Sequence, residues 1–210
     1  MQFTFKIWAK IKEVWPIYKL HFGTFILLLV ITLVVKAVGS GHNLILATLS
    51  YVVSLILAYI WIRFGFSLVD KKDFNPFSKE ALPSLPQFWN LFKTIILYML
   101  SILGGIILLV IPGLYVCGRL IFAIYLSVEK NQGARITIEE AWNMTKGYGW
   151  QLFWKSFLIG LFMAVGFIVF FVGGFVTYPI GFIIMIMMYR EFSKMKSETP
   201  TNPVPAVDMK

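Results

Sequence analysis

Charged residues are scarce in this chain, and several long stretches contain none. Of the 210 residues, 14% are charged and 59% are hydrophobic, whereas a soluble domain carries about a quarter charged residues. A domain of this size cannot bury such stretches, so we expect lipid to be their solvent. The net charge of +9 then indicates cationic loops facing an anionic membrane surface, and we expect no nucleic-acid partner.

Cysteine pairs and the common motifs of catalysis are also missing. Cys117 is the single cysteine, which excludes an internal disulfide and a cysteine-based metal cluster. The sequence has no HExxH, no GxSxG and no phosphate-binding glycine loop. His21 and His42 have no helical histidine or carboxylate partner that would favour a metal site. We therefore predict no catalytic, metal-binding or cofactor-binding residues, and we expect that the chain is not an enzyme.

Apolar runs fill most of the sequence and alternate with short breaks. They predict an all-α membrane protein with six transmembrane helices arranged as three hairpins, since about 20 residues cross the hydrocarbon core. The predicted spans are about 22–40, 43–66, 88–111, 113–130, 150–172 and 174–190. We interpret the first run as a span, not a cleaved signal, because a long aromatic segment precedes it. Residues 1–195 form one domain, and the tail 196–210 is expected to be disordered because of its low hydrophobicity.

Lysine and arginine are distributed unevenly between the two sides of these spans. They cluster before the first span, in the loops near residues 70–93 and 129–155, and after the last span. The opposite connections are short and nearly uncharged, and two of them form predicted hairpin tips at Pro112–Gly113 and Gly173–Gly174. By the positive-inside rule, both termini are cytoplasmic and the chain is a multi-pass protein of the cell membrane.

The second and third hairpins also align with each other at a shift of 61 residues. Trp89 to Phe92 matches Trp150 to Phe153, and Gly105 matches Gly166. Both copies run in the same direction, so we predict a parallel internal repeat.

An amphipathic segment precedes each predicted hairpin. Residues 7–18 and 137–146 place apolar side chains at helical spacing, whereas Pro83 and Pro86 limit any helix before the second hairpin. These segments have two interpretations: helices in the membrane interface that sense or shape lipid, or helices that seal the cytoplasmic rim of the bundle.

The C-terminal half carries a pattern of glycine, proline and charged residues that is similar to a known family. The matching residues are Ile111, Pro112, Gly113, Arg119, Glu129, Gly133, Ile136, Glu140, Ala141, Thr145, Gly147 and Trp150. The chain resembles an uncharacterised family of prokaryotic six-helix integral membrane proteins, allied to the membrane domain of some glycerophosphodiester phosphodiesterases. The family tends to have serine at the position of Thr145. The resemblance implies a membrane module without an established activity, because the phosphodiester reaction belongs to a separate soluble domain.

Two charged residues of the fourth span are the candidate site residues. Arg119 lies roughly 9 Å below the outer end of this span, where a charge costs at least ~2–3 kcal/mol unless it is paired or hydrated. It therefore snorkels, binds backbone carbonyls or hydroxyls, or contacts a lipid phosphate or another anion. Glu129 ends the span, and we expect a structural ion pair with Arg135, Lys155 or Arg190, with Arg135 as the candidate partner.

Two functions remain open at this level. The first is a non-catalytic membrane module that organises lipid or supports a partner membrane protein. The alternative is a small transporter or channel for an anionic or lipid-like solute, although transporters usually carry more polar residues inside the membrane. Membrane lipids are the expected partners in both cases, and the sequence does not determine whether the chain forms a homo-oligomer.

Overall fold

A computed structural model describes residues 3–41, 43–108, 110–169 and 173–198, and every regular element in these ranges is helical. The α-helices are α1 (Ile7–Leu20), α2 (Phe22–Gly39), α3 (Leu44–Val69), α4 (Leu85–Leu108), α5 (Val110–Leu120), α6 (Ala123–Lys130), α7 (Ala134–Met144), α8 (Gly149–Val169) and α9 (Gly174–Glu198). A 3-10 helix, η1 (Lys79–Ala81), lies between α3 and α4.

Five helical segments in the described residues are long and apolar enough to cross a membrane: Phe22–Gly39, Leu44–Val69, Lys79–Ile107, Ile111–Lys130 and Gly174–Glu198. This result supports the predicted all-α, multi-pass membrane protein. The 21-residue helix α8 is not among the five.

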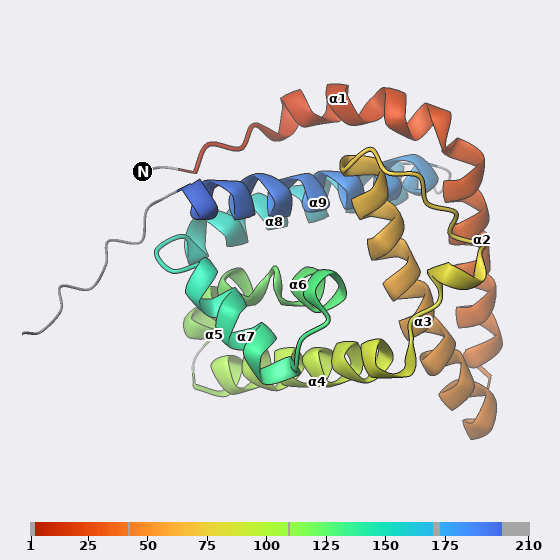
Figure 1. The fold of residues 1–210 in the computed structure, drawn as a ribbon, viewed down its shortest axis with the longest axis horizontal. Helices are drawn as coiled ribbons and strands as arrows, with labels where there is room; N and C mark the ends of the chain where they lie inside the picture. The colour runs from red at the N-terminus through yellow and green to blue at the C-terminus, as the bar shows by residue number, and fades with distance from the viewer. Residues whose placement is uncertain (1–2, 42, 109, 170–172, 199–210) are drawn as a thin grey trace, which may run out of the picture.

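The most extensive helix contacts join α4 with α5, α8 with α9, α2 with α3, and α5 with α8. Figure 1 shows α2 and α3 side by side at the right, with α4 along the lower edge and α9 across the upper part. Helix α1 lies along α9, and the chain turns at His21 to enter α2. Aromatic rings join α9 to α3 and α6: the ring of Tyr189 in α9 packs against Phe66, Phe122 and Tyr125.

Local sequence signals account for several helix ends. Asn43 caps the N-terminus of α3, because its side-chain oxygen accepts hydrogen bonds from the amides of Ile45 and Leu46. Pro86 lies in the first turn of α4, where a proline does not cost a helical hydrogen bond. Asn131 ends α6 in the left-handed conformation, with φ 47°.

The predicted hairpin tip at Pro112–Gly113 lies inside a helix. Helix α4 ends at Leu108 and α5 begins at Val110, so both residues belong to the first turn of α5. Proline is compatible with that turn, and Gly113 allows a close approach to α4: a Cβ there would lie 2.9 Å from the Ile106 nitrogen. The other predicted tip matches a helix start, since Gly173 forms a turn and Gly174 begins α9.

The predicted fourth span and the predicted tail also differ from the helices. The segment 113–130 is divided between α5 and α6, with a turn at Ile121 and Phe122 directly after Leu120. Helix α9 continues to Glu198, so the first three residues of the predicted tail 196–210 are helical, because no proline or glycine interrupts them. Residues 199–210 lie outside the described part.

The three amphipathic segments pack differently from one another. Val14 and Tyr18 of α1 are buried, while Trp8 is 79% exposed. Helix α7 packs against α4, α5 and α6. Between α3 and α4, η1 is the only helix in the described segment, as the prolines predict. Thus α1 and α7 both lie against the helix bundle.

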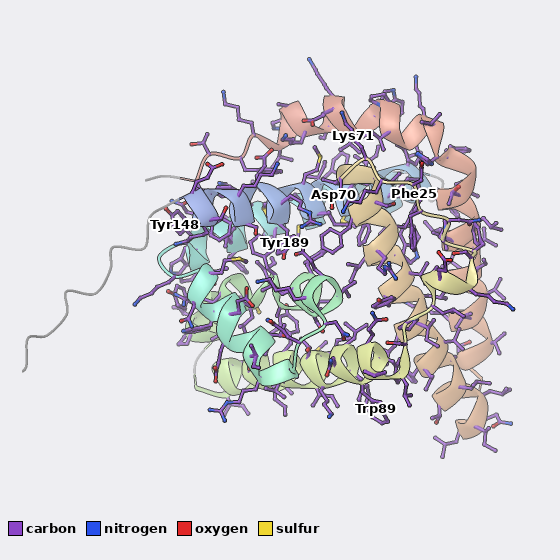
Figure 2. All side chains as sticks on the ribbon, viewed as in Figure 1. Phe25, Asp70, Lys71, Trp89, Tyr148 and Tyr189 are labelled. Carbon is purple, nitrogen blue, oxygen red and sulfur yellow. The ribbon has the colours of Figure 1, made fainter. Side chains whose placement is uncertain are left out.

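The two segments of the predicted repeat begin with similar ring contacts. The rings of Trp89 and Phe92 meet edge to face with centroids 5.7 Å apart, and those of Trp150 and Phe153 do so at 6.0 Å. Trp89 projects from the outer side of α4 (Figure 2). The repeat itself remains a prediction.

Candidate functional site

Arg119 is 4% exposed and lies in the last turn of α5. Its Nη1 donates to the Tyr115 hydroxyl at 3.3 Å, and its Nη2 donates to the carbonyl oxygen of Trp142 in α7. The guanidinium also lies over the Trp142 ring, 4.2 Å from the centroid. Of the alternatives predicted for Arg119, the structure shows the one in which it binds a backbone carbonyl and a hydroxyl.

Neighbouring groups strengthen the same contact between α5 and α7. The buried Thr145 hydroxyl donates to the Arg119 carbonyl oxygen at 2.6 Å. Helix α5 also approaches α8 closely, because a Cβ on Gly149 would lie 3.0 Å from the Arg119 Cδ. The Arg119 Nε is buried and has no hydrogen-bond partner in the described residues. Two of the three guanidinium nitrogens, Nη1 and Nη2, thus bind protein groups, and the third, Nε, is buried.

Glu129 pairs with Arg190, one of the three cations that the sequence offered. The Arg190 Nη1 donates to Glu129, and the Tyr189 hydroxyl donates to the other oxygen of the same carboxylate. Arg135 is not the partner, since it pairs with Glu139 one helical turn away at 2.9 Å. The candidate pair of Glu129 with Arg135 is therefore corrected: the turn after α6 and the start of α7 direct Arg135 along its own helix.

Arg190 also binds a second carboxylate that the sequence analysis missed. Its Nη2 donates to the Asp70 Oδ2 at 2.6 Å, and its guanidinium lies 4.4 Å from the Phe66 ring centroid. Asp70 directly follows α3, Glu129 lies in the last turn of α6, and Arg190 lies in α9. We call Asp70, Glu129 and Arg190 the hairpin clamp, because each residue comes from a different predicted hairpin. Figure 2 shows Asp70 beside the end of α3 and Tyr189 below α9.

One sequence signal could have identified part of the hairpin clamp. Glu129 and Arg190 are 61 residues apart, which is the shift of the predicted repeat. Equivalent positions of two packed repeats meet where the copies face each other, so the partner of Glu129 could have been sought there. Asp70 had no such signal, because the first hairpin does not align with the other two.

A polar cavity of about 410 Å³ adjoins the hairpin clamp. Its lining includes all three clamp residues together with Arg63, Lys72 and Asp73. The three cations and three carboxylates balance in charge. Arg63 is also held in place, since its Nη1 donates to the Glu80 carbonyl oxygen at 3.2 Å. The cavity therefore surrounds an ion cluster in which the clamp carboxylates already have a cationic partner.

An apolar groove of about 520 Å³ lies between the α2–α3 pair and α9. Its lining residues are Leu29, Thr32, Leu33, Lys36, Ser54, Leu57, Ala58, Trp61, Ile62, Phe175, Tyr178 and Phe182. The Trp61 Nε1 donates to the Thr32 hydroxyl at 3.3 Å, which closes one wall between α2 and α3. Lys36 is the one charged residue among these lining residues. This volume is within the range of small-molecule sites, and most of the groove surface is apolar.

Ion pairs outside the predicted spans shift two pKa values. Burial acts to raise the pKa of Glu140, but hydrogen bonds from Lys130 and Gln132 outweigh it and hold this pKa below its ordinary value of 4.5. Burial acts to lower the pKa of Lys10, but its bonds to Glu13 and Glu191 raise it. The first set joins α6 to α7, and the second joins α1 to α9.

Comparison of the chain with protein-family models, with curated proteins and with solved structures finds no match.

Proposed function

We propose that this chain is a six-span, non-catalytic membrane module that binds and organises lipid through the apolar groove. Helix α8 is the sixth span in this proposal. Its 21 residues correspond to roughly 30 Å of helix, which matches the hydrocarbon core. Both termini are cytoplasmic, as the charge distribution predicts. We also propose that the chain belongs to the six-helix family that it resembles.

The observation that carries the proposal is the apolar groove between α2, α3 and α9. Its walls consist mainly of leucine, isoleucine and aromatic side chains, which favour contact with hydrocarbon over water. The α2–α3 pair is also apolar on its exposed side: Leu44 and Ile45 are 81% and 78% exposed. A groove flanked by exposed apolar helices opens to the same medium as those helices, and an acyl chain can enter it from the bilayer.

Burial of hydrocarbon alone gives the groove little affinity for an acyl chain that comes from the bilayer. Each methylene removed from water contributes about 0.8 kcal/mol, although a chain leaving the bilayer gains much less because it is already in hydrocarbon. The groove must therefore retain lipid through shape and a few polar contacts. This requirement favours a module that binds particular lipids and does not catalyse a reaction on them.

The test is whether lipid stays bound when the protein is taken from nanodiscs into detergent. The bound lipid is measured by native mass spectrometry. Wild-type protein is expected to retain a bound phospholipid after detergent exchange. Ala58→Phe fills the groove with an aromatic ring and is expected to lose this lipid. Ala164→Phe adds the same ring at an exposed position on α8, outside the groove, and is the matched control.

Circular dichroism and size-exclusion chromatography check that both variants fold. Equal lipid retention by folded Ala58→Phe and by wild-type protein would contradict the proposed function, because the groove would then not be the binding site.

A further inference from the structure

One end of the apolar groove carries a cation with no ionic partner. Lys36 is exposed in the last turn of α2, and within the described residues it forms no ion pair and no side-chain hydrogen bond. None of the described residues that line the groove carries a carboxylate. Lys10, Lys130 and Arg190 all pair with carboxylates in the same structure. Lys36 thus leaves a positive charge beside apolar surface, where it attracts an anion.

Two hydroxyl groups of the groove are also available for a ligand. Ser54 of α3 and Tyr178 of α9 line the groove, and neither hydroxyl makes a hydrogen bond within the described residues. The Thr32 hydroxyl, by contrast, donates to the Leu28 carbonyl oxygen and accepts from Trp61. The free hydroxyls can donate to ester or phosphate oxygens, which an alkane does not have.

The positions along α2 place the charged and apolar parts at different ends. Leu29 and Lys36 are seven residues apart, which corresponds to about 10 Å along the helix. Leu29 is near the apolar end, with Trp61, Ile62 and Phe182, while Lys36 lies toward the tip of the α2–α3 pair with Ser54. An amphiphile with an anionic head and an acyl chain matches this order of groups.

We propose that the groove binds a phospholipid with a net negative head group, whose phosphate contacts Lys36 while one acyl chain lies between α2, α3 and α9. The inference rests on the proposed function and adds the charge of the lipid. A zwitterionic phospholipid has the same acyl chains and phosphate, but its ammonium group reduces the attraction to a lysine.

The experiment compares phosphatidylglycerol with phosphatidylcholine of the same acyl chains in mixed nanodiscs at equal amounts. Native mass spectrometry measures which lipid remains bound. Wild-type protein is expected to retain phosphatidylglycerol with a roughly tenfold preference, in line with one charge-assisted hydrogen bond. Lys36→Gln removes the preference while some lipid remains bound, and Lys36→Arg keeps it. Lys93→Gln, at an exposed cation outside the groove, keeps the preference.

Each outcome separates this inference from the proposed function. Equal retention of the two lipids by wild-type protein overturns the inference but leaves the groove as a lipid site. A preference that survives in Lys36→Gln also overturns it, whatever the result for Lys93→Gln. If free oleate added to the nanodiscs displaces phosphatidylglycerol at equal concentration, the ligand is a fatty acid and the inference fails. If Ala58→Phe leaves lipid retention unchanged, the proposed function fails as well.

Discussion

Replacing Arg190 with glutamine tests whether the hairpin clamp holds α3, α6 and α9 together. The side chains of Arg190, Asp70 and Glu129 are 22%, 25% and 28% exposed. An exposed ion pair contributes up to about 1 kcal/mol, and removing one partner of a buried pair costs about 3–5 kcal/mol. Two contacts of intermediate exposure place the cost of Arg190→Gln at about 2 kcal/mol. For a chain of this length, that cost lowers Tm by about 4–8 °C.

The assay is a thermal scan of detergent-purified protein followed by intrinsic tryptophan fluorescence, at fixed detergent, salt and protein concentration. Arg135→Gln is the matched control, because the Arg135 and Glu139 side chains are 87% and 59% exposed. It is expected to lower Tm by about 1 °C. Arg190→Lys keeps the charge but cannot reach two carboxylates with one planar group, so an intermediate Tm is expected.

A second comparison separates the ion cluster from simple packing. In the Arg190→Gln background, neutralising both carboxylates by Asp70→Asn and Glu129→Gln removes the unpaired charges and is expected to recover part of the lost Tm. A stabilising role of the hairpin clamp is refuted if Arg190→Gln melts within 1 °C of Arg135→Gln. It is also refuted if adding Asp70→Asn and Glu129→Gln to Arg190→Gln lowers Tm further, each substitution by its own separate loss.

Two further predictions concern α7. Arg119→Gln loses the contact with the Trp142 carbonyl oxygen and the stacking on its ring, so stability is expected to fall by about 2 kcal/mol in the same thermal assay; lost lipid binding at unchanged Tm would indicate an anion site at Arg119 instead. Because the pKa of Glu140 is lowered on folding, its stabilisation is present above the unfolded pKa and is lost as pH falls below 4.5 and through the folded pKa. Wild-type Tm is therefore expected to fall more steeply than that of Glu140→Gln between pH 5 and pH 3, and parallel curves would contradict the role of Lys130.

Hydrophobic runs predicted the helices well because a run long enough to cross a bilayer has few alternative structures. The predicted first span, 22–40, nearly coincides with α2, and the predicted third span lies within three residues of α4. The tip at Pro112–Gly113 was wrong for a local reason. Proline and glycine also occur in a first helical turn, and the sequence alone does not distinguish that turn from the break before it.

The site residues were harder to predict, because their partners come from distant segments. Three cations were open to Glu129, and only the packing of α9 against α3 and α6 selects Arg190. Arg119 was identified as a strained position, but its carbonyl partner belongs to Trp142, and no side-chain pattern marks a backbone carbonyl. The apolar groove had no sequence signal, since its residues have the same character as the rest of the spans.

The hairpin clamp lies at the C-terminal end of α3, and the apolar groove lies along the middle of the same helix. At the Asp70 end, Arg190 joins α3 to α9, and a Cβ on Gly65 would overlap Ile186, so the two helices are in close contact. At the other end, Leu44 is exposed and α3 contacts mainly α2. The groove residues of α3, from Ser54 to Ile62, lie between these two ends. The groove therefore begins within one helical turn of the close contact at Gly65, and we expect loss of the clamp to affect lipid retention although no described clamp residue lines the groove.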